Sequence, residues 1–403
     1  MVEPSGIPSL LWVSLAAALA PWLSDRLAML RLPVVALELL LGVLIGPDGL
    51  WLAAIEGPLP WLARIGVAML FFFLAGTEID LGTLRGDPLR RGIASWLLSL
   101  ALASALAFGC AHLGLVQAPA AVALALSTTA LGVIAPILKD RGLSTTPLGV
   151  CAMACGVMGE VGPILLMSAL FAGPGHRLAQ AGLTTLFVVI AVAVWWASLR
   201  LRPPGLLGML ARTMHRSGQW PVRVCLLLVT ALVVLAENFG LDLALGAFAA
   251  GLAVGQANRN PHSEVLSHKL DAVGFGLLVP VFFITSGMQL EVRSLFAEPA
   301  ASGTVALVAL LLLLVRGLPA ALFLPALSPR EAAAVGLYAA TSLSLIVALT
   351  GAAVAAGHMT RFNATQLVTA GLVSVLVFPW LASLLLRRPP REPTPSTPSA
   401  DGL

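Results

Sequence analysis

The sequence predicts an all-α polytopic membrane protein with about thirteen transmembrane helices, and three observations support this fold class. Only 10% of the 403 residues are charged, 59% are hydrophobic, and the mean hydropathy is +0.96. A soluble domain carries about 25% charged residues, because polar groups must cover its surface. Apolar runs long enough to cross a bilayer recur along the whole chain, and the cations gather in alternate loops between them. The composition therefore excludes an ordinary soluble enzyme.

The candidate helices are apolar runs bounded by charge, proline or glycine, since a span needs about 20 residues. In chain order they cover residues 8–23, 33–46, 59–76, 93–112, 119–138, 147–171, 178–199, 221–236, 241–255, 272–286, 303–324, 332–353 and 364–386. The ninth and tenth of these segments are short. The longest loop, residues 200–220, contains RPPG and is typical of a linker between two halves of a bundle.

The basic residues indicate how the chain is oriented, because cytoplasmic loops collect Lys and Arg. If Arg223, at the start of the segment 221–236, is counted with the loop before it, loops after odd-numbered segments hold 18 of the 23 Lys and Arg and loops after even-numbered segments hold 3. The remaining two, Arg64 and Arg316, fall within segments. This separation predicts an N-terminus outside and a C-terminus in the cytoplasm. The net charge of +4 forms no basic stripe interleaved with aromatics, so the expected partner is the lipid bilayer and no nucleic acid.

The domain organisation follows from the order of these segments. One membrane domain is expected over residues 1–386, with inverted repeats over about 8–171 and 221–386 and a linker helix over about 178–199, because an offset of seven segments reverses the orientation of related helices. The remaining residues, 387–403, are rich in proline and serine and predict a disordered cytoplasmic tail.

The fifth and twelfth segments, 119–138 and 332–353, both contain hydroxyl groups and helix breakers at similar depth. Their polar residues are Ser127, Thr128 and Thr129 in one and Thr341, Ser342 and Ser344 in the other, accompanied by Gly132, Pro136 and Gly351. Such interruptions in corresponding positions of two halves are typical of discontinuous helices that line an ion site. The alternative is that these hydroxyls only bond back to their own helices.

Glu160 is the most exceptional acid of the sequence. It has no charged neighbour across CAMACGVMGEVGPILLMSAL, which places it near the middle of the membrane. An ionisable group there costs at least about 2.5–3.5 kcal/mol on insertion scales, so it marks a candidate functional site. A buried carboxyl can exchange a proton for a monovalent cation, and Glu160 is therefore a candidate ion- and proton-binding residue. A structural carboxyl neutralised by a neighbouring helix is the alternative.

Arg316 is the second deep charge, within TVALVALLLLLVRGLPAALFL. Arginine keeps its proton in proteins, so Arg316 needs an anionic partner, a cluster of carbonyl groups or water. Glu160 is one candidate partner, and a structural role is the other interpretation. The sequence contains no GxSxG, HExxH or P-loop motif, and these absences give no sign of an enzyme, a nucleotide cofactor or a resident metal.

Several segments together resemble the monovalent cation:proton antiporter superfamily, in particular its second, bacterial branch. The segments that carry the resemblance are LPVVALELLLGVLIGPDGL, FFFLAGTEIDLGTLR, ALALSTTALGVIAPILKDRGLSTTPLG, LALGAFAAGLAVG and GLLVPVFFITSGMQLEVRSL. They occur in the family's order and cover roughly residues 10–385. No single one is diagnostic, and the strength of the resemblance lies in the whole set.

The resemblance implies a thirteen-helix antiporter fold that forms a homodimer, with two crossed broken helices corresponding to 119–138 and 332–353. The family carries an ion-binding carboxylate as the second member of a DD, ND or QD pair, which aligns here with Gly159 and Glu160. This chain thus departs from the family at both positions. Arg316 falls where the family has a core Lys or Arg.

The resemblance further implies exchange of Na⁺ or K⁺ for H⁺ by alternating access in a bacterial-type inner membrane. With one carboxylate at the pair, we expect electroneutral one-for-one exchange at Glu160, with Ser127, Thr128 and Thr129 supplying oxygen ligands. Two other functions stay open. One is a diverged membrane sensor or regulatory protein that no longer exchanges ions, and the other is a channel or organic-anion transporter of related architecture.

Overall fold

The computed structural model describes most of the chain, and the regular structure in the described part is entirely helical. The described residues are 6–26, 33–66, 72–78, 86–114, 116–170, 177–200, 218–239, 241, 243–257 and 263–386. Eight helices among them are long and apolar enough to cross a membrane, and shorter apolar helices accompany these eight. The chain is therefore a polytopic helical membrane protein, as the composition predicts.

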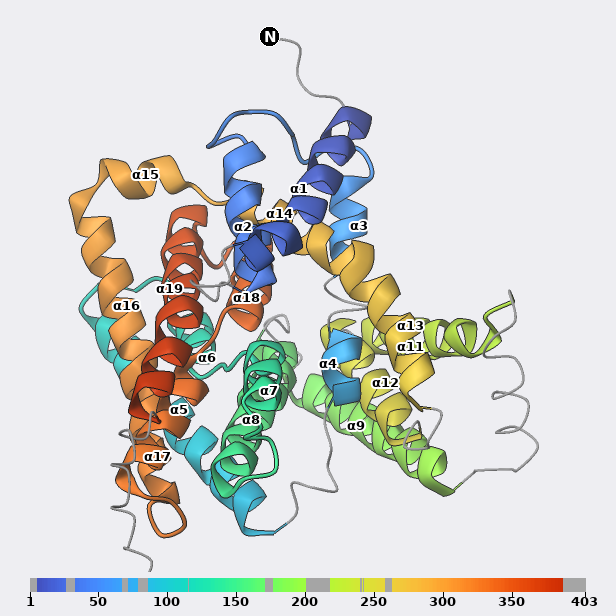
Figure 1. The fold of residues 1–403 in the computed structure, drawn as a ribbon, viewed down its shortest axis with the longest axis vertical. Coiled ribbons are helices and arrows are strands. Elements are labelled where there is room, and N and C mark those ends of the chain that lie inside the picture. The colour runs from blue at the N-terminus through green and yellow to red at the C-terminus, as the bar shows by residue number, and fades with distance from the viewer. Residues whose placement is uncertain are drawn as a thin grey trace, which may run out of the picture.

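Figure 1 shows the helices in chain order from the N-terminus, in blue, to the C-terminus, in red. Their bounds are α1 Gly6–Arg26, α2 Val34–Ile45, α3 Leu59–Ile65, α4 Phe72–Glu78, α5 Asp87–His112, α6 Pro119–Leu126, α7 Leu131–Asp140, α8 Pro147–Leu170, α9 Arg177–Arg200, α11 Trp220–Asn238, α12 Leu243–Ala257, α13 Ser263–Val273, η3 Gly274–Leu278, α14 Val279–Met288, α15 Val292–Ala297, α16 Pro299–Gly317, η4 Leu318–Phe323, α17 Pro329–Ala340, α18 Ser344–Ala355 and α19 Arg361–Leu385.

These helices fall on the predicted segments, with three differences. The predicted segment 59–76 carries two helices, α3 and α4, and residues 67–71 lie outside the described residues. The predicted segment 272–286 is part of a longer helical stretch that begins at Ser263 and includes a π-helical turn, η3. The first turns of this stretch contain the charged residues Lys269 and Asp271, so a search for apolar runs leaves these turns out. The third difference is α15, a helix of six residues that is too short for any periodic pattern. The predicted tail, residues 387–403, lies outside the described residues.

The helices pack into two groups that lie side by side in Figure 1. The first group, here called the core bundle, contains α5–α8 and α16–α19 with η4. The second, here called the scaffold bundle, contains α1–α4, α9 and α11–α14 with η3. Only α8 among the core helices makes substantial contacts with the scaffold in the described part of the chain, through α9 and α12. The short helix α15 connects the scaffold helix α14 to the core helix α16.

Glycine residues allow the scaffold helices to approach one another closely. A Cβ atom on Gly42 of α2 would collide with the carbonyl group of Ile284 on α14, and one on Gly287 of α14 would collide with the carbonyl group of Leu39. Because lipid gives helices no hydrophobic reason to associate, membrane helices depend on such close backbone contact. The pair α2–α14 is therefore held by shape rather than by polar groups.

Candidate functional site

The first predicted interruption is confirmed: α6 ends at Leu126 and α7 begins at Leu131. In between, the hydroxyls of Ser127 and Thr128 donate back to the carbonyls of Leu124 (2.8 Å) and Ala125 (2.7 Å). The back-bonding that the sequence left as an alternative is thus present here, but at the end of a half-helix rather than within a continuous one. The same two carbonyls also accept from the backbone N–H groups of Ser127 (3.1 Å) and Thr128 (3.3 Å), so each is bonded by both the backbone and the side chain of one residue.

The second interruption is confirmed as well: α17 ends at Ala340 and α18 begins at Ser344. The Thr341 hydroxyl donates to the carbonyl of Leu337 at 3.0 Å. The backbone N–H of Ser342 donates to the Ser374 hydroxyl at 3.0 Å, and this hydroxyl lies 2.9 Å from the Ser342 carbonyl, to which it donates. Ser374 on α19 therefore holds the extended stretch in place.

The two interrupted elements cross and bond to each other. The N–H of Ala130 donates to the carbonyl of Thr341 at 2.8 Å, and the hydroxyls of Thr128 and Ser342 share a hydrogen bond. Every hydroxyl residue of both interruptions is buried, including Ser344 at the start of α18. The C-terminal ends of α6 and α17 and the N-terminal ends of α7 and α18 consequently meet at one place, where their partial charges of both signs are available to an ion.

Glu160 lies on α8, which packs against both interrupted elements, and its side chain is almost completely buried. Positions 156 and 160 share one face of α8, because side chains four residues apart align. A Cβ atom built on Gly156 would lie 2.8 Å from Cδ1 of Leu131, the first residue of α7 after the interruption. The carboxyl of Glu160 is thus on the face of α8 that looks toward the crossing.

The residue before Glu160 is bonded directly to the first interruption. The N–H of Thr129 donates to the carbonyl of Gly159 at 3.0 Å. In an uninterrupted helix this carbonyl accepts from the residue four positions later, which here is Pro163, inside α8. Proline has no N–H to donate. The carbonyl of Gly159 is therefore free to accept from Thr129.

Arg316, in the last turn of α16, is fully buried beside this arrangement. In the part of the chain that the structure describes, its five hydrogen bonds all go to neutral oxygen atoms rather than to a carboxylate. The acceptors are the Thr129 hydroxyl (3.1 Å from Nε and 2.6 Å from Nη2), the Ala339 carbonyl (3.2 Å), the Ser99 hydroxyl (3.1 Å) and the Cys155 carbonyl (3.1 Å). Of the three kinds of partner expected for Arg316, a cluster of neutral oxygens is the one observed.

The structure therefore gathers the predicted polar residues into one buried region of the core bundle. The sequence did not single out Ser99 on α5 or Ser374 on α19, and both take part. Ser99 follows Gly92 and Ser95 on the buried face of α5. This stripe of small residues is the sequence signal that could have indicated a buried role for Ser99. The only other carboxyl side chain buried among the described residues is Glu38, on α2 of the scaffold.

Two broken helices that cross beside a buried carboxylate, inside a bundle of membrane helices, define a class of protein. This is the architecture of secondary transporters with discontinuous helices, in which half-helix ends and unwound backbone surround the ion site. The family comparison agrees. The model of the sodium/hydrogen exchanger transmembrane family matches residues 14–388, and the chain belongs to this family.

Individual relatives are consistent with this assignment. A putative Na⁺/H⁺ antiporter, YjbQ, from Bacillus subtilis is 26% identical over 364 residues, covering 85% of this chain and 57% of that protein. The glutathione-regulated potassium-efflux protein KefC from Klebsiella pneumoniae is 31% identical over 307 residues, covering 73% of this chain and 46% of that protein. The chain thus spans about half the length of these two relatives.

A solved structure shows the same fold. The sodium proton antiporter MjNhaP1 from Methanocaldococcus jannaschii at pH 8 matches with a TM-score of 0.67 at 16% sequence identity, covering 94% of this chain and 98% of that one. The expectation of an antiporter fold, drawn from the sequence motifs, is therefore confirmed.

Proposed function

We propose that this protein exchanges Na⁺ or K⁺ for H⁺ across the membrane by alternating access, and that Glu160 carries either ion. The observation that carries this proposal is the burial of Glu160 on the face of α8 that Gly156 presents to the start of α7, at the crossed interruptions. A carboxylate in that position binds a proton or a small hard cation, and the two exclude each other because they use the same oxygen atoms.

The surroundings of Glu160 suit a monovalent cation. Alkali cations prefer oxygen ligands such as carboxylate, carbonyl and water. The stretch that begins at Ser127 and Thr128 places carbonyls and hydroxyls near α8, and the opposite stretch contributes Thr341, Ser342 and the first turn of α18 at Ser344. In this proposal these groups complete the oxygen shell when a cation replaces the proton on Glu160.

The proposed stoichiometry is one cation for one proton. The position before Glu160 is Gly159, so only one carboxylate is available at the pair in each turnover. Arg316 keeps its charge throughout and is held by neutral groups. A site that alternates between a bound proton and a bound cation on a single carboxylate moves no net charge.

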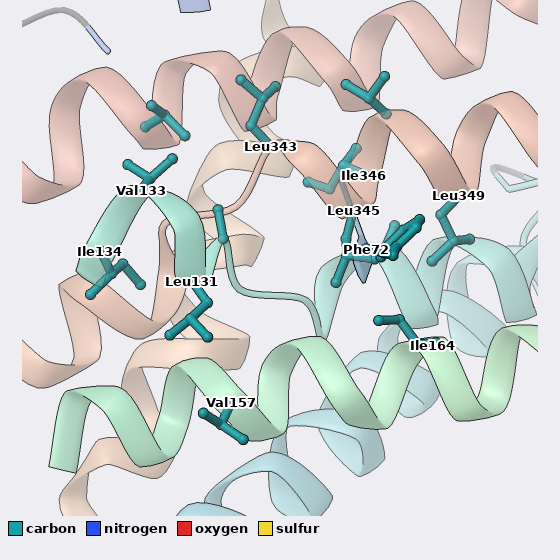
Figure 2. Close-up of a cluster of buried hydrophobic side chains, with 14 of the residues drawn as sticks. Phe72, Leu131, Val133, Ile134, Val157, Ile164, Leu343, Leu345, Ile346 and Leu349 are labelled. Carbon is teal, nitrogen blue, oxygen red and sulfur yellow. The ribbon is translucent and has the colours of Figure 1, made fainter. Parts of the chain in front are cut away.

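Alternating access requires two parts that move relative to each other, and the division into core and scaffold bundles supplies them. Figure 2 shows Phe72 of α4 beside Leu345 and Leu349 of α18, near Ile164 of α8. A scaffold side chain thus closes an apolar cluster over the crossing. Movement of the core bundle past α4 opens and closes the path to Glu160 in this proposal.

The setting proposed for this activity is a bacterial-type inner membrane, with the N-terminus outside and the C-terminus in the cytoplasm. The unequal distribution of Lys and Arg between alternate loops supports this orientation. We propose a homodimer on the strength of the family resemblance, with the scaffold bundle, which does not contain the crossing, as the part that pairs.

The experiment that tests the proposal uses everted membrane vesicles that contain the protein. A transmembrane pH gradient is imposed, and its collapse on addition of Na⁺ or K⁺ is followed between pH 6 and 9. We expect a cation-dependent collapse with the wild type and none with Glu160→Gln. A wild-type protein that collapses the gradient with neither cation overturns the proposal and favours a non-exchanging sensor. Exchange that survives Glu160→Gln shows that the carrier is a different residue.

The matched control for this experiment is Glu38→Gln, which neutralises the other buried carboxyl but lies on α2 of the scaffold. We expect exchange by this variant to remain within about twofold of wild type, the scale of a change that touches no transition-state or binding interaction. An imposed membrane potential tests the stoichiometry. Turnover that does not respond to it supports electroneutral exchange, and clear voltage-driven turnover contradicts one-for-one exchange.

A further inference from the structure

Position 159 has no side chain, and the structure shows what occupies that space. A Cβ atom built on Gly159 would lie 2.7 Å from Nη2 of Arg316 and 2.7 Å from Cβ of Thr129. Real Cβ atoms do not approach other heavy atoms so closely, since cores are packed to contact. Arg316 and Thr129 therefore fill the volume that a side chain at 159 would need.

The hydroxyl of Thr129 is fully committed to this arrangement. It accepts from Nε of Arg316 at 3.1 Å and from Nη2 at 2.6 Å, and it donates to the carbonyl of Ala339 at 2.6 Å. A hydroxyl offers one donor and two acceptor positions, and all three are used. This distinguishes Thr129 from Ser127 and Thr128, whose side chains make no contact with Arg316.

We propose that Thr129 is a positioning residue that seats Arg316 in the space left by the missing side chain at 159. The guanidinium then stands in the space that a side chain at 159 would take. This inference rests on the proposed function, because Thr129 would hold a fixed positive charge at the residue that precedes the ion-carrying Glu160. It assigns Thr129 to the arginine and leaves cation binding to the other oxygen atoms of the crossing.

The seat has a physical consequence for exchange. Charges interact strongly over short distances in the protein interior, where the effective dielectric constant is far below that of water. Arg316 held beside position 159 places a fixed positive charge at the residue that precedes Glu160 on α8. If the guanidinium loses this position, the electric field at the Glu160 carboxyl changes, and the pH dependence of exchange changes with it.

The first test compares two substitutions at Thr129. Valine keeps the shape of the side chain, and serine keeps its hydroxyl. Thr129→Val removes the acceptor, and Thr129→Ser retains it. We expect Thr129→Val to lower exchange at pH 7 at least about tenfold, the scale of losing a hydrogen bond to a charged group, and to shift the pH profile of exchange. Thr129→Ser is expected to keep the wild-type profile.

The matched control is Thr285→Val on α14, because Thr285 is also buried and its hydroxyl bonds only within its own helix, to Val281 and Phe282. We expect the wild-type profile for this variant. An unchanged pH profile in Thr129→Val, or an equal shift in Thr285→Val, overturns the proposal that Thr129 positions Arg316.

The second test does not depend on exchange. Thermal unfolding of the purified protein in detergent is measured for Gly159→Ala, Thr129→Gly and the double variant. If the two positions compete for one volume, alanine at 159 lowers the unfolding temperature in the wild type but costs much less when position 129 is glycine. Strictly additive effects contradict the shared volume. Because this cycle reads packing alone, it can succeed or fail whether or not the protein exchanges ions.

Discussion

The N–H of Thr129 donates to the carbonyl oxygen of Gly159 at 3.0 Å. This hydrogen bond joins the interruption of the α6–α7 element to the peptide group that precedes Glu160. It exists because the normal helical donor to that carbonyl is replaced by Pro163. A shift of the interruption therefore acts on Glu160 through one peptide bond. The local sequence GEVGP contains the carboxyl of Glu160 and also Pro163, which leaves the Gly159 carbonyl open to Thr129.

The substitution Pro163→Ala tests this link. Alanine restores an N–H that can donate to the carbonyl of Gly159 within α8, in competition with Thr129. We expect slower exchange together with unchanged or higher thermal stability, since proline in a helix interior costs about 3 kcal/mol. Exchange is measured in proteoliposomes and unfolding in detergent.

The control is Pro379→Ala, which removes a proline from the interior of α19 and should affect stability without slowing exchange. If Pro163→Ala exchanges ions at the wild-type rate, the link between Thr129 and Gly159 has no part in the mechanism.

The pH dependence of exchange follows from competition at one carboxyl. A proton and a cation that share Glu160 compete by mass action. At pH values where Glu160 is mostly protonated, the Na⁺ or K⁺ concentration for half-maximal exchange should rise about tenfold for each unit of decrease in pH, with the maximal rate nearly unchanged. Initial rates at several cation concentrations between pH 6 and 9 give this dependence. A half-saturating concentration that does not vary with pH would exclude a shared site.

Phe72 on α4 is expected to control access to Glu160. It is fully buried against α18 although it belongs to the scaffold bundle (Figure 2). Phe72→Ala removes most of a large apolar side chain and should let water and small reagents reach the carboxyl more often. We expect a carbodiimide to label Glu160 several-fold faster in this variant.

Labelling is read by mass spectrometry in a Glu38→Gln background, so that the other buried carboxyl does not contribute. Phe108→Ala on the exposed face of α5 is the control, because its side chain is about half exposed. Equal labelling rates in the two variants would show that Phe72 does not limit access.

Arg293 is expected to influence the rate of conformational change. It lies on α15, which connects the two bundles, and its side chain donates to the carbonyls of Asp48 (2.8 Å) and Gly49 (3.0 Å) on the loop after α2. The neighbouring N–H of Glu291 donates to Thr365 of α19 at 3.0 Å. The connection is thus tied to the scaffold on one side and to the core on the other.

Removing the scaffold tie with Arg293→Ala should change the maximal rate of exchange while leaving the half-saturating cation concentration within about twofold, because the contact involves neither ion nor carboxyl. Rates in proteoliposomes check this. The exposed Arg361→Ala at the start of α19 is the control. A changed cation affinity with an unchanged maximal rate contradicts this role for Arg293.

The sequence carried enough information to predict the fold and the interrupted helices. Long apolar runs define spans with little ambiguity, and the hydroxyls near residues 127–136 and 341–351, together with Pro136 and Gly351, stand out against them. Glu160 and Arg316 stand out for the same reason, since charge is rare in such segments. Each of these features can be recognised from residues that are close together in the sequence, and a single sequence contains that information directly.

The partners of these groups could not be predicted in the same way. Arg316 bonds to Ser99 and Thr129, which lie far from it in the sequence, and the choice of neutral oxygens over Glu160 is decided by how α5, α8 and α16 pack. The role of Gly159 is also a packing result, because a glycine in a sequence does not say what fills its place. The helix α15 was missed since six residues have no useful periodicity.

The most direct test of the account is protection of Glu160 from carbodiimide labelling by the transported cation. Purified protein is labelled at fixed pH over a range of Na⁺ and K⁺ concentrations, and the modified residue is quantified by mass spectrometry. The account predicts that labelling falls as the transported cation rises, with half-protection at the concentration that gives half-maximal exchange. Labelling of Glu160 that is independent of both cations, in a preparation that exchanges one of them, would contradict it.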